Sequence, residues 1–398
     1  MAEPGSQSNI AQRVNIAKEE TPYVIAPRQV TAILTCTLIG MGVLTLPRIA
    51  SYWAHEAGWL SIFLGMFMAM LGMGLISSLG QRFVGQTVVS YSRQLLGGKT
   101  RPRLGVVLSF PILISLAGIW LADTSMITRA FSEVIMAAVL ENTPMNVILF
   151  LMLATAMYLA MHEAEVIARV NELLFPLIVI PVLLLTLISF QNARWNNLLP
   201  LFPVDWRAFF ISLLATSVFY KGFEMMLVLS AFTQPIPAAR RAQFIGIGIP
   251  ALLNTLITLA AIAVFSYEEL ERLMWPTLEL ATSTEIPGLI FERVEAAYLA
   301  VWVAAIFTAI SNFYFATAKI LQESFRIRHH QWIVLGLFPL LLWLSNLPAH
   351  VYQVFHWIEI LGYLSVLLWL GIPLILWLLA QIRLREKNGN RRTDHPGQ

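Results

Sequence analysis

Two charged residues, Lys221 and Glu224, lie within an otherwise apolar stretch that runs from Phe209 to Phe232. An ionised side chain inside a membrane helix is costly unless it is paired or hydrated, so such residues need a partner. If the stretch is helical, the i and i+3 spacing lets the two side chains pair with each other. In the other hypothesis, Glu224 or freed backbone carbonyls receive a ligand ammonium. Lys221 then holds a carboxylate or changes its protonation in place of a sodium ion.

Each of two apolar stretches is interrupted near its centre. The stretch around Lys221 is broken at residues 220–224, and an earlier one, from Val30 to about Ser51, is broken at Gly40-Met41-Gly42. Breaks of this kind are tolerated mainly where protein or a water-filled cavity satisfies the freed backbone groups. The glycines permit close approach of a ligand, and the N-terminus of the next half-helix, from Val43, favours a carboxylate. Tight helix packing against small residues is the alternative.

Further polar residues accompany other apolar stretches. Asp123 lies deep in the third stretch and is a candidate for the site or its entrance. Arg129 and Glu133 have the i,i+4 spacing of an ion pair on a helix that emerges into the outer aqueous layer. Asn312, in the eighth stretch, could face the cavity, whereas Lys319 on the same helical face is expected to reach the cytoplasmic surface.

No motif indicates catalysis or a metal site. His162, Glu163 and Glu165 lie together at the end of a stretch, but the second His that a zinc-binding helix needs four residues later is absent. The sequence has no Ser/His/Asp, P-loop or phosphate-binding signature. Cys36 is the single cysteine, which excludes an internal disulfide. We therefore expect neither an enzyme nor a cofactor or metal ion.

Membrane helices must position these residues. Of the 398 residues, 58% are hydrophobic and 12% charged, and the mean hydropathy is +0.70. A soluble domain has about twice this share of charged residues. We expect about ten stretches that can cross a hydrocarbon core of about 30 Å. They lie near residues 30–51, 59–79, 104–128, 145–161, 173–190, 208–232, 244–266, 296–319, 332–345 and 356–380.

The positions of the two breaks suggest an internal repeat. If the spans divide equally, residues 30–190 and 205–380 form halves of similar length, and each half begins with an interrupted span. This pattern is typical of inverted-repeat transporters, whose ligand site lies at the membrane midplane between the broken helices. The sequence thus predicts an all-α integral membrane protein of about ten helices in a five-plus-five inverted repeat. Residues 1–29 and 381–398 form an N-terminal segment and a basic tail.

The distribution of charge predicts the orientation. Lys and Arg are concentrated in the segments that share a side with the N-terminus, whereas the loop 267–295 on the other side is acidic. The positive-inside rule then places both termini in the cytoplasm. We expect the basic tail to contact anionic membrane lipid and not nucleic acid.

Several longer runs of sequence resemble a known family. They are TPYVIAPRQVTAILTCTLIGMGVLTLPRIASYWAHEAGWLS, VVSYSRQLLGGK, HEAEVIARVNELLFP, KGFEMMLVLSAF and FERVEAAYLAVWVAAIF. From Pro22 to about Arg385, the chain is similar to the spore-germination permease family, the B subunits of nutrient germinant receptors in endospore-forming bacteria. That family belongs to the amino acid–polyamine–organocation superfamily, whose fold is the inverted five-plus-five bundle.

The resemblance implies a location, partners and a site. It places the protein in the spore inner membrane beside an A subunit and a lipoprotein C subunit, with a small nutrient, often an amino acid, as ligand. Glu224 matches an acidic position usual in the family, whereas the assignment of Lys221 rests on the physical argument above. The superfamily's site corresponds here to Gly40, Met41, Gly42, Val43, Tyr220, Lys221, Gly222, Phe223 and Glu224.

Three functions are compatible with these observations. The first is a receptor subunit, in which a bound nutrient favours one conformation by a few kcal/mol and partner helices respond. The second is an amino acid–proton symporter, in which Lys221 or Glu224 changes its protonation during alternating access. The third is a structural scaffold whose site is vestigial.

Overall fold

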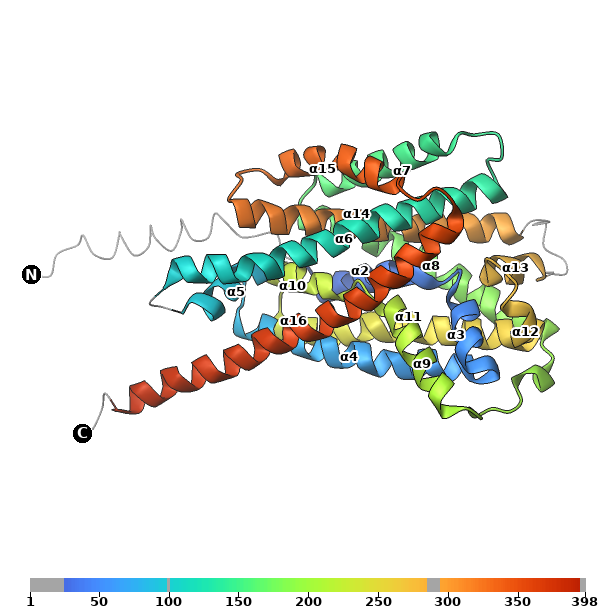
Figure 1. Ribbon diagram of the computed structural model, residues 1–398, viewed down its shortest axis with the longest axis horizontal. Coiled ribbons are helices and arrows are strands. Elements are labelled where there is room, and N and C mark those ends of the chain that lie inside the picture. Colours follow the sequence, from blue (N-terminus) through green and yellow to red (C-terminus); the bar gives the residue numbers. More distant parts are fainter. Residues whose placement is uncertain (1–24, 99–100, 285–293, 394–398) are drawn as a thin grey trace, which may run out of the picture.

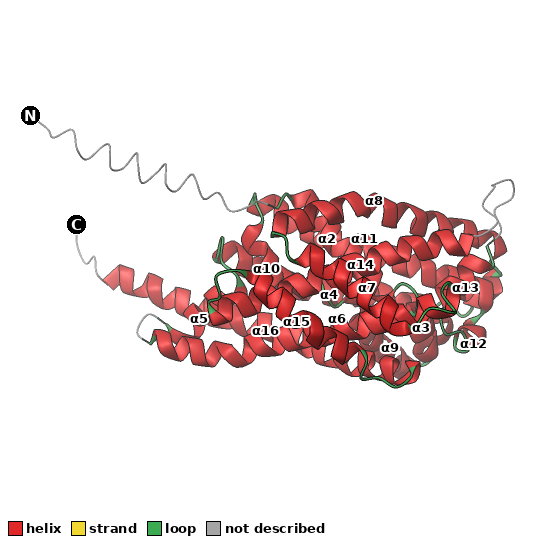
Figure 2. Cartoon of the chain, turned by 90° about the horizontal axis from the view of Figure 1, so that it is seen from above, coloured by secondary structure: helices red, strands yellow, loops and turns green. Residues whose placement is uncertain are grey.

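Long apolar runs form helices here because a backbone in lipid must satisfy its own amides and carbonyls. The computed structural model describes residues 25–98, 101–284 and 294–393. Within these ranges the helices lie side by side along the long axis of the molecule (Figure 1 and Figure 2). Here β-type pairing is confined to an isolated bridge between Ile25 and Thr233. The prediction of an all-α protein is confirmed.

Six helical segments in the described ranges are long and apolar enough to cross a membrane. They are α3 (Leu46–Ala54) joined to α4 (Gly58–Arg82), α6 (Pro102–Ala138), α8 (Ala164–Ser189), α11 (Ile236–Phe265), α14 (Val294–Phe325) and α16 (Val351–Thr393). A bent pair that contains α9 (Trp206–Ser217) and α10 (Met226–Leu229) can be a seventh span. The protein is therefore a multi-pass membrane protein, while the number of about ten spans stays a prediction.

Three further helices are apolar but short. α2 (Pro27–Gly42), α7 (Met145–Ala160) and α15 (His330–Ser345) have 16 residues each, which gives a length of about 24 Å. α7 and α15 pack on each other and against α6 and α14 at one side of the bundle (Figure 1). The remaining short helices lie at the two ends and are α5 (Val88–Gly97), α12 (Tyr267–Leu270) and α13 (Pro276–Thr282).

The centre of the bundle is α2, which packs against α8, α11 and α14. Small residues allow this close packing. A β-carbon on Gly40 would lie 2.6 Å from the Ala305 carbonyl oxygen of α14, and one on Gly246 of α11 would lie 2.8 Å from Leu34. Helices in membranes commonly approach through such positions. The first break, which follows α2, is therefore held in the middle of the molecule.

Three predicted boundaries need correction. α6 continues to Ala138, beyond the predicted end at 128, and the expected i,i+4 pair of Arg129 with Glu133 forms within this helix, where both side chains are largely buried. α8 begins at Ala164, about two and a half turns before the predicted span at 173. α16 continues to Thr393, so the expected tail is helical over most of its length. Residues 1–24 of the predicted N-terminal segment and 285–293 of the acidic loop lie outside the described ranges.

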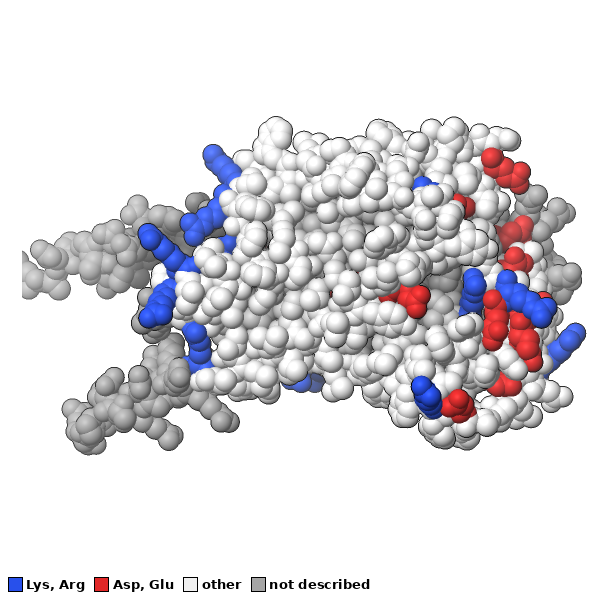
Figure 3. Space-filling view, viewed as in Figure 1, with Lys and Arg blue, Asp and Glu red and all other residues white. Residues whose placement is uncertain are grey.

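Charged side chains gather at the two ends of the molecule. In Figure 3, Lys and Arg cluster at the end where α2 begins and α16 ends, and most acidic residues cluster at the opposite end. The wide band between them is nearly free of charge on this face, as a lipid-facing surface requires. The two ends of the described chain thus lie on the same side of the apolar band.

Candidate functional site

The first break lies slightly later than the sequence indicated. Gly40, Met41 and Gly42 form the last turn of α2, the turn comprises residues 43–45, and the next half-helix begins at Leu46 and not at Val43. The cause is Pro47, which has no amide hydrogen to donate to the Val43 carbonyl four residues earlier. That carbonyl instead accepts a hydrogen bond from Thr277 Oγ1 of α13 at 2.6 Å. Protein groups therefore satisfy the freed carbonyl.

The second break lies where the sequence predicted it. α9 and the turn Val218–Tyr220 end before Lys221 and Gly222, and the chain continues from Phe223 to Phe232 at an angle of 45°. Gly222 has a φ of +113°, a conformation that other residues rarely adopt. A β-carbon there would also lie 3.0 Å from Thr37 Cγ2 of α2. The glycine thus lets the two broken spans lie in direct contact.

Lys221 is paired with Asp123 of α6, not with Glu224. Lys221 Nζ donates a hydrogen bond to Asp123 Oδ1 at 2.5 Å, and the two side chains are 2% and 1% exposed. The i,i+3 pair, one of the two alternatives from the sequence, does not form because the chain turns at Gly222 and is not helical there. The second carboxylate oxygen, Asp123 Oδ2, is buried and has no hydrogen-bond partner among the described residues. The pair therefore retains one unused acceptor.

Glu224 is also buried, but its oxygens are occupied. Oε1 accepts a hydrogen bond from Trp120 Nε1 of α6 at 3.1 Å, and Oε2 accepts one from the Gly222 amide at 2.6 Å. Both groups are donors, so they suit the ionised carboxylate. Trp120 and Asp123 lie one turn apart on α6, and this face of α6 therefore holds both charged residues of the second break.

A cavity of about 540 Å³ lies beside the two breaks. Gly40, Met41, Gly42 and Lys221 line its inner part, and the side walls are mostly apolar. Its outer part, near the start of α16, carries charged and titratable side chains. The apolar wall residues include Ile127, Val218, Phe219, Trp302 and Ile306, and the outer residues include Arg48, Glu133, His356 and Glu359.

Four of the predicted ligand-binding residues thus line the cavity, and the other seven do not. Asp123 is connected to the cavity through Lys221. The Tyr220 hydroxyl donates a hydrogen bond to the Ile62 carbonyl at 2.8 Å, and the Phe223 ring packs edge-on against Trp369. Val43, Tyr220, Gly222, Phe223, Glu224, Asp123 and Asn312 lie outside the lining of this cavity in the described structure.

Asn312 belongs to a polar cluster that the sequence did not reveal. Its side-chain amide forms two reciprocal hydrogen bonds with that of Asn171 on α8, at 3.0 and 3.1 Å. It also donates a hydrogen bond to Thr37 Oγ1 on α2 at 2.8 Å. Asn171 escaped prediction because the fifth span was placed two residues after it. The cluster joins α2, α8 and α14 next to the part of α2 that precedes the first break.

Direct contacts between helices fill the region between the two breaks and the end of the bundle where α2 begins. The Ile25 amide donates to the Phe232 carbonyl at 2.7 Å, and Arg28 forms an ion pair of 2.6 Å with Glu172 of α8. Gln29 of α2 donates a second hydrogen bond to Glu172 at 2.9 Å. A cavity therefore adjoins the two breaks on one side, and a layer of direct helix–helix contacts separates them from the end of the bundle on the other.

Comparison with known sequences gives a consistent result. A family model described as "Spore germination protein" matches residues 24–354. Spore germination protein B2 of Bacillus subtilis (strain 168) is 27% identical over 363 residues, which cover 91% of this chain and 96% of that protein. Spore germination protein YndE of the same organism is 28% identical, with coverages of 91% and 97%. GerLB of Bacillus cereus is 23% identical over 372 residues.

Solved structures show a matching fold. The crystal structure of MhsT in complex with L-phenylalanine aligns with a TM-score of 0.60 at 13% identity, covering 89% of this chain and 88% of that one. Mhp1, a nucleobase-cation-symport-1 family transporter in a closed conformation with bromovinylhydantoin bound, aligns with a TM-score of 0.63 at 15% identity. The coverages in that case are 89% and 78%. The chain has the fold of these transporters, and none of these relatives or neighbours is described as an enzyme.

Proposed function

The chain belongs to the spore germination protein family, and from this premise we propose that it is the nutrient-sensing subunit of a germinant receptor. In this role it binds a small nutrient at the membrane midplane and signals to partner subunits. The partners are an A subunit and a C subunit, and the site of action is the inner membrane of the spore. Both ends of the described chain face the cytoplasm in this proposal, because α2 begins and α16 ends at the basic end of the molecule.

The observation that carries the proposal is the cavity that reaches Lys221 between the two broken spans. Lys221 contributes one hydrogen bond to Asp123, which leaves ammonium hydrogens for a second anionic group. A ligand carboxylate can take them without separating the buried pair. The mostly apolar walls suit an uncharged, apolar side chain on that ligand.

We propose that the ligand ammonium approaches Asp123 Oδ2, which lies behind Lys221 and outside the lining of the cavity in this structure. This oxygen is buried without a partner among the described residues, and a buried acceptor of this kind gains most from a charged donor. An α-amino acid brings both groups, whereas each oxygen of Glu224 already accepts a hydrogen bond from a protein donor. The proposed ligand is therefore a zwitterionic amino acid with an apolar side chain.

The signal would be a change in conformational populations. A ligand held between Gly40–Gly42 of the first broken span and Lys221 of the second favours the state in which these segments are close together. A differential affinity of a few kcal/mol is sufficient to change the dominant state. The helices that carry the ligand groups pack on α14 and α16, which can transmit the change to neighbouring subunits.

An amino acid–proton symporter of the same fold is the second candidate. The observation in its favour is the combination of a cavity on one side of the breaks and closure by Ile25, Phe232, Arg28 and Glu172 on the other. Alternating access requires such a one-sided arrangement. Uptake of labelled ligand into proteoliposomes separates the two functions, since a receptor subunit alone should show binding without accumulation.

Ligand-dependent thermal stabilisation of the purified protein tests the proposal. The panel contains apolar amino acids and, for each, the amide that lacks the carboxylate and the acid that lacks the amine, together with sugars and nucleosides. We expect stabilisation by an intact amino acid and a loss with either analogue. Stabilisation by a sugar or nucleoside in its place would contradict the assigned chemistry.

A further inference from the structure

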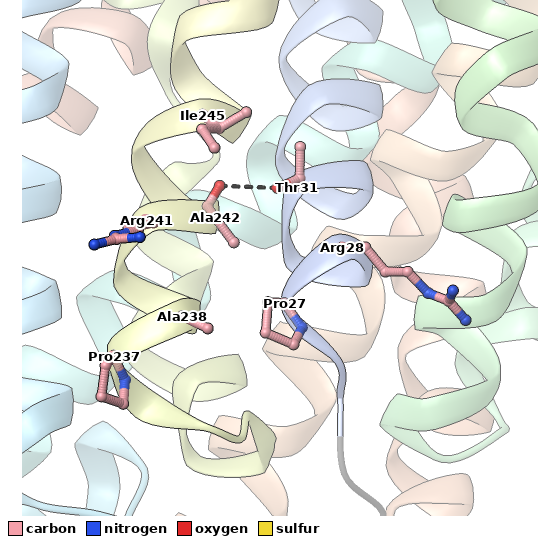
Figure 4. A pocket seen from close by; sticks show the side chains of 8 residues that line it. All are labelled: Pro27, Arg28, Thr31, Pro237, Ala238, Arg241, Ala242 and Ile245. Atoms are coloured by element: carbon pink, nitrogen blue, oxygen red, sulfur yellow. Dashed lines mark hydrogen bonds between the residues drawn. The ribbon is translucent and has the colours of Figure 1, made fainter.

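Two grooves flank the first turns of α11, at the end of the bundle where α2 begins. One, of about 520 Å³, lies between α11 and the start of α2 (Figure 4). The other, of about 1030 Å³, lies between α11 and the end of α4, and includes Gln81. Pro237, Arg241 and Ile245 line both grooves. The grooves thus form one continuous surface around a helix end.

This surface is positively charged. Arg28, Arg240 and Arg241 line it, and no acidic residue does so in the described part of the chain. Figure 4 shows that Arg28 points away from the groove, toward the helix that carries its partner Glu172, and that Arg241 points away from α2. Arg240 and Arg241 are exposed and form no ion pair within the described ranges.

The start of α11 adds to the charge. Its first turn contains no acidic residue, and the N-cap position is Pro235, whose side chain cannot accept a hydrogen bond. The unpaired amides and the helix dipole therefore add positive potential beside the two arginines. An anionic group is the chemical complement of this end of the helix.

An apolar strip continues from the arginines toward the middle of the bundle. Ile245 and Leu252 are 53% and 54% exposed, and seven residues separate them, so they share one face of α11. Phe244 lines the groove next to Ile245. Since α11 is long and apolar enough to span the membrane, this strip faces acyl chains.

We propose that an anionic phospholipid binds at this surface. Its phosphate lies against Arg240 and Arg241 at the N-terminus of α11, and its acyl chains follow the grooves along Ile245 and Leu252. Arginine binds phosphate through two parallel hydrogen bonds, and basic pockets between membrane helices are typical headgroup sites. A ligand with a charged head and a long apolar tail matches the charge at the helix end and the apolar strip below it.

The bound lipid also has a structural role. Thr31 of α2 donates a hydrogen bond to the Ala242 carbonyl of α11 at 3.1 Å (Figure 4), and Ile25 pairs with Thr233 just before α11 begins. A lipid that bridges α11 to α2 and α4 stabilises the closed end of the bundle. Anionic lipid therefore favours the state in which the site is closed toward this leaflet.

Native mass spectrometry of the purified full chain tests this site. The protein is titrated with phosphatidylglycerol and, separately, with phosphatidylcholine of the same acyl composition. The test variant is Arg240→Gln/Arg241→Gln, and the matched control is Arg194→Gln/Arg207→Gln, which removes two exposed arginines at the opposite end. We expect about twenty-fivefold weaker binding of phosphatidylglycerol in the test variant, from about fivefold per arginine, and little change in the control. Equal loss in both variants, or equal binding of the two lipids, would overturn the proposal.

A second variant separates the grooves from general surface charge. Ala238→Phe fills the groove between α11 and α2 and changes no charge. It should weaken binding of phosphatidylglycerol in a sample whose melting temperature in phosphatidylcholine is unchanged. If it binds the lipid as well as the wild type does, or if free glycerophosphate competes as well as the lipid, no lipid lies in the groove.

Discussion

The buried pair of Lys221 and Asp123 is the main charged feature of the site at the scale of single residues. Two charges at most 2% exposed lose their hydration, and only their short contact compensates for that loss. Removal of one partner therefore leaves the other as an isolated buried charge. A variant that removes one of the two charges therefore tests their role in folding, whereas a variant that neutralises both tests their role in ligand binding.

For Lys221→Gln we expect a loss of about 3–5 kcal/mol in stability, because Asp123 remains ionised without a partner. The double variant Lys221→Gln/Asp123→Asn should recover most of it, since a neutral hydrogen-bonded pair replaces the ion pair. The measurement is the free energy of unfolding in detergent for both single variants and the double variant. Equal losses for the single and double variants would argue against the pair.

Glu224→Gln is expected to act on structure and not on ligand recognition. The amide can still accept from one donor, but its nitrogen then meets the other, Trp120 Nε1 or the Gly222 amide. We predict a loss of about 1–3 kcal/mol in stability. The affinity for the nutrient, measured by calorimetry on the folded fraction, should change by less than the stability does. A large loss of affinity for the nutrient at unchanged stability would contradict this prediction and would show that Glu224 binds the ligand.

At the residue scale, the sequence predicts that Lys221 and Glu224 need partners, but not which ones. Asp123 is 98 positions away from Lys221, and no local pattern links them. Trp120, which binds Glu224, looks like any apolar wall residue in the sequence. Partners that come from tertiary packing leave no periodic signal.

At the scale of elements, the first break depends on Pro47 and on its replacement donor, Thr277. Thr277 comes from α13, which is far from α2 in the sequence. Thr277→Val keeps the shape of the side chain and leaves the Val43 carbonyl buried without its donor. We expect a loss of about 1–3 kcal/mol in thermal unfolding.

The companion variant is Pro47→Ala, which restores an amide four residues after Val43. In this background Thr277→Val should cost less, because the carbonyl gains a helical donor. If the two substitutions are additive, the hydrogen bond of Thr277 does not hold the break. A double-mutant cycle of the two substitutions measures this: a non-zero coupling energy supports the role of the hydrogen bond, and a coupling energy of zero contradicts it.

The breaks themselves were predictable from glycine and charge within apolar runs, with an error of a few residues in the first. Gly40 and Gly42 looked like the break but serve the packing of α2 as well, since a β-carbon on Gly42 would lie 2.5 Å from Phe219. The end of α6 was placed too early and the start of α8 too late, because the polar residues Arg129 and Asn171 are buried inside these helices. Hydropathy assigns such residues to loops.

At the scale of the whole molecule, the two sides of the breaks differ. The ion pair of Arg28 with Glu172 belongs to the closed side, and Cys36, the single cysteine, is fully buried between that side and the first break. Opening of the closed side would therefore expose this thiol. The rate at which Cys36 is alkylated therefore reports how often the closed side opens.

For Glu172→Gln we expect Cys36 to react about two- to fivefold faster with a membrane-permeant alkylating reagent. The factor follows from the loss of a partly exposed ion pair of at most about 1 kcal/mol. Arg169→Gln, which removes the exposed ion pair of Arg169 with Glu165, is the matched control and should leave the rate unchanged. Equal acceleration by both variants would show that the pair of Arg28 does not hold the closed side.

At this scale the sequence predicts most of the fold. Composition and the two interrupted spans indicate an all-helical transporter fold, which the structural comparisons confirm. The halves 30–190 and 205–380 stay a prediction, as do the orientation and the partner subunits. The grooves beside α11 could not be predicted, because they arise from the way α2, α4 and α11 diverge at one end.

Calorimetric titration of the stabilising amino acid into the wild type and the double variant Lys221→Gln/Asp123→Asn tests the central claim most directly. The double variant keeps a neutral pair and its fold, but it offers neither charge to a zwitterion. We predict at least about tenfold weaker binding, the effect of losing charge-assisted hydrogen bonds to both ends of the ligand. Unchanged affinity in the folded double variant would contradict the assignment of the site to the Lys221–Asp123 pair.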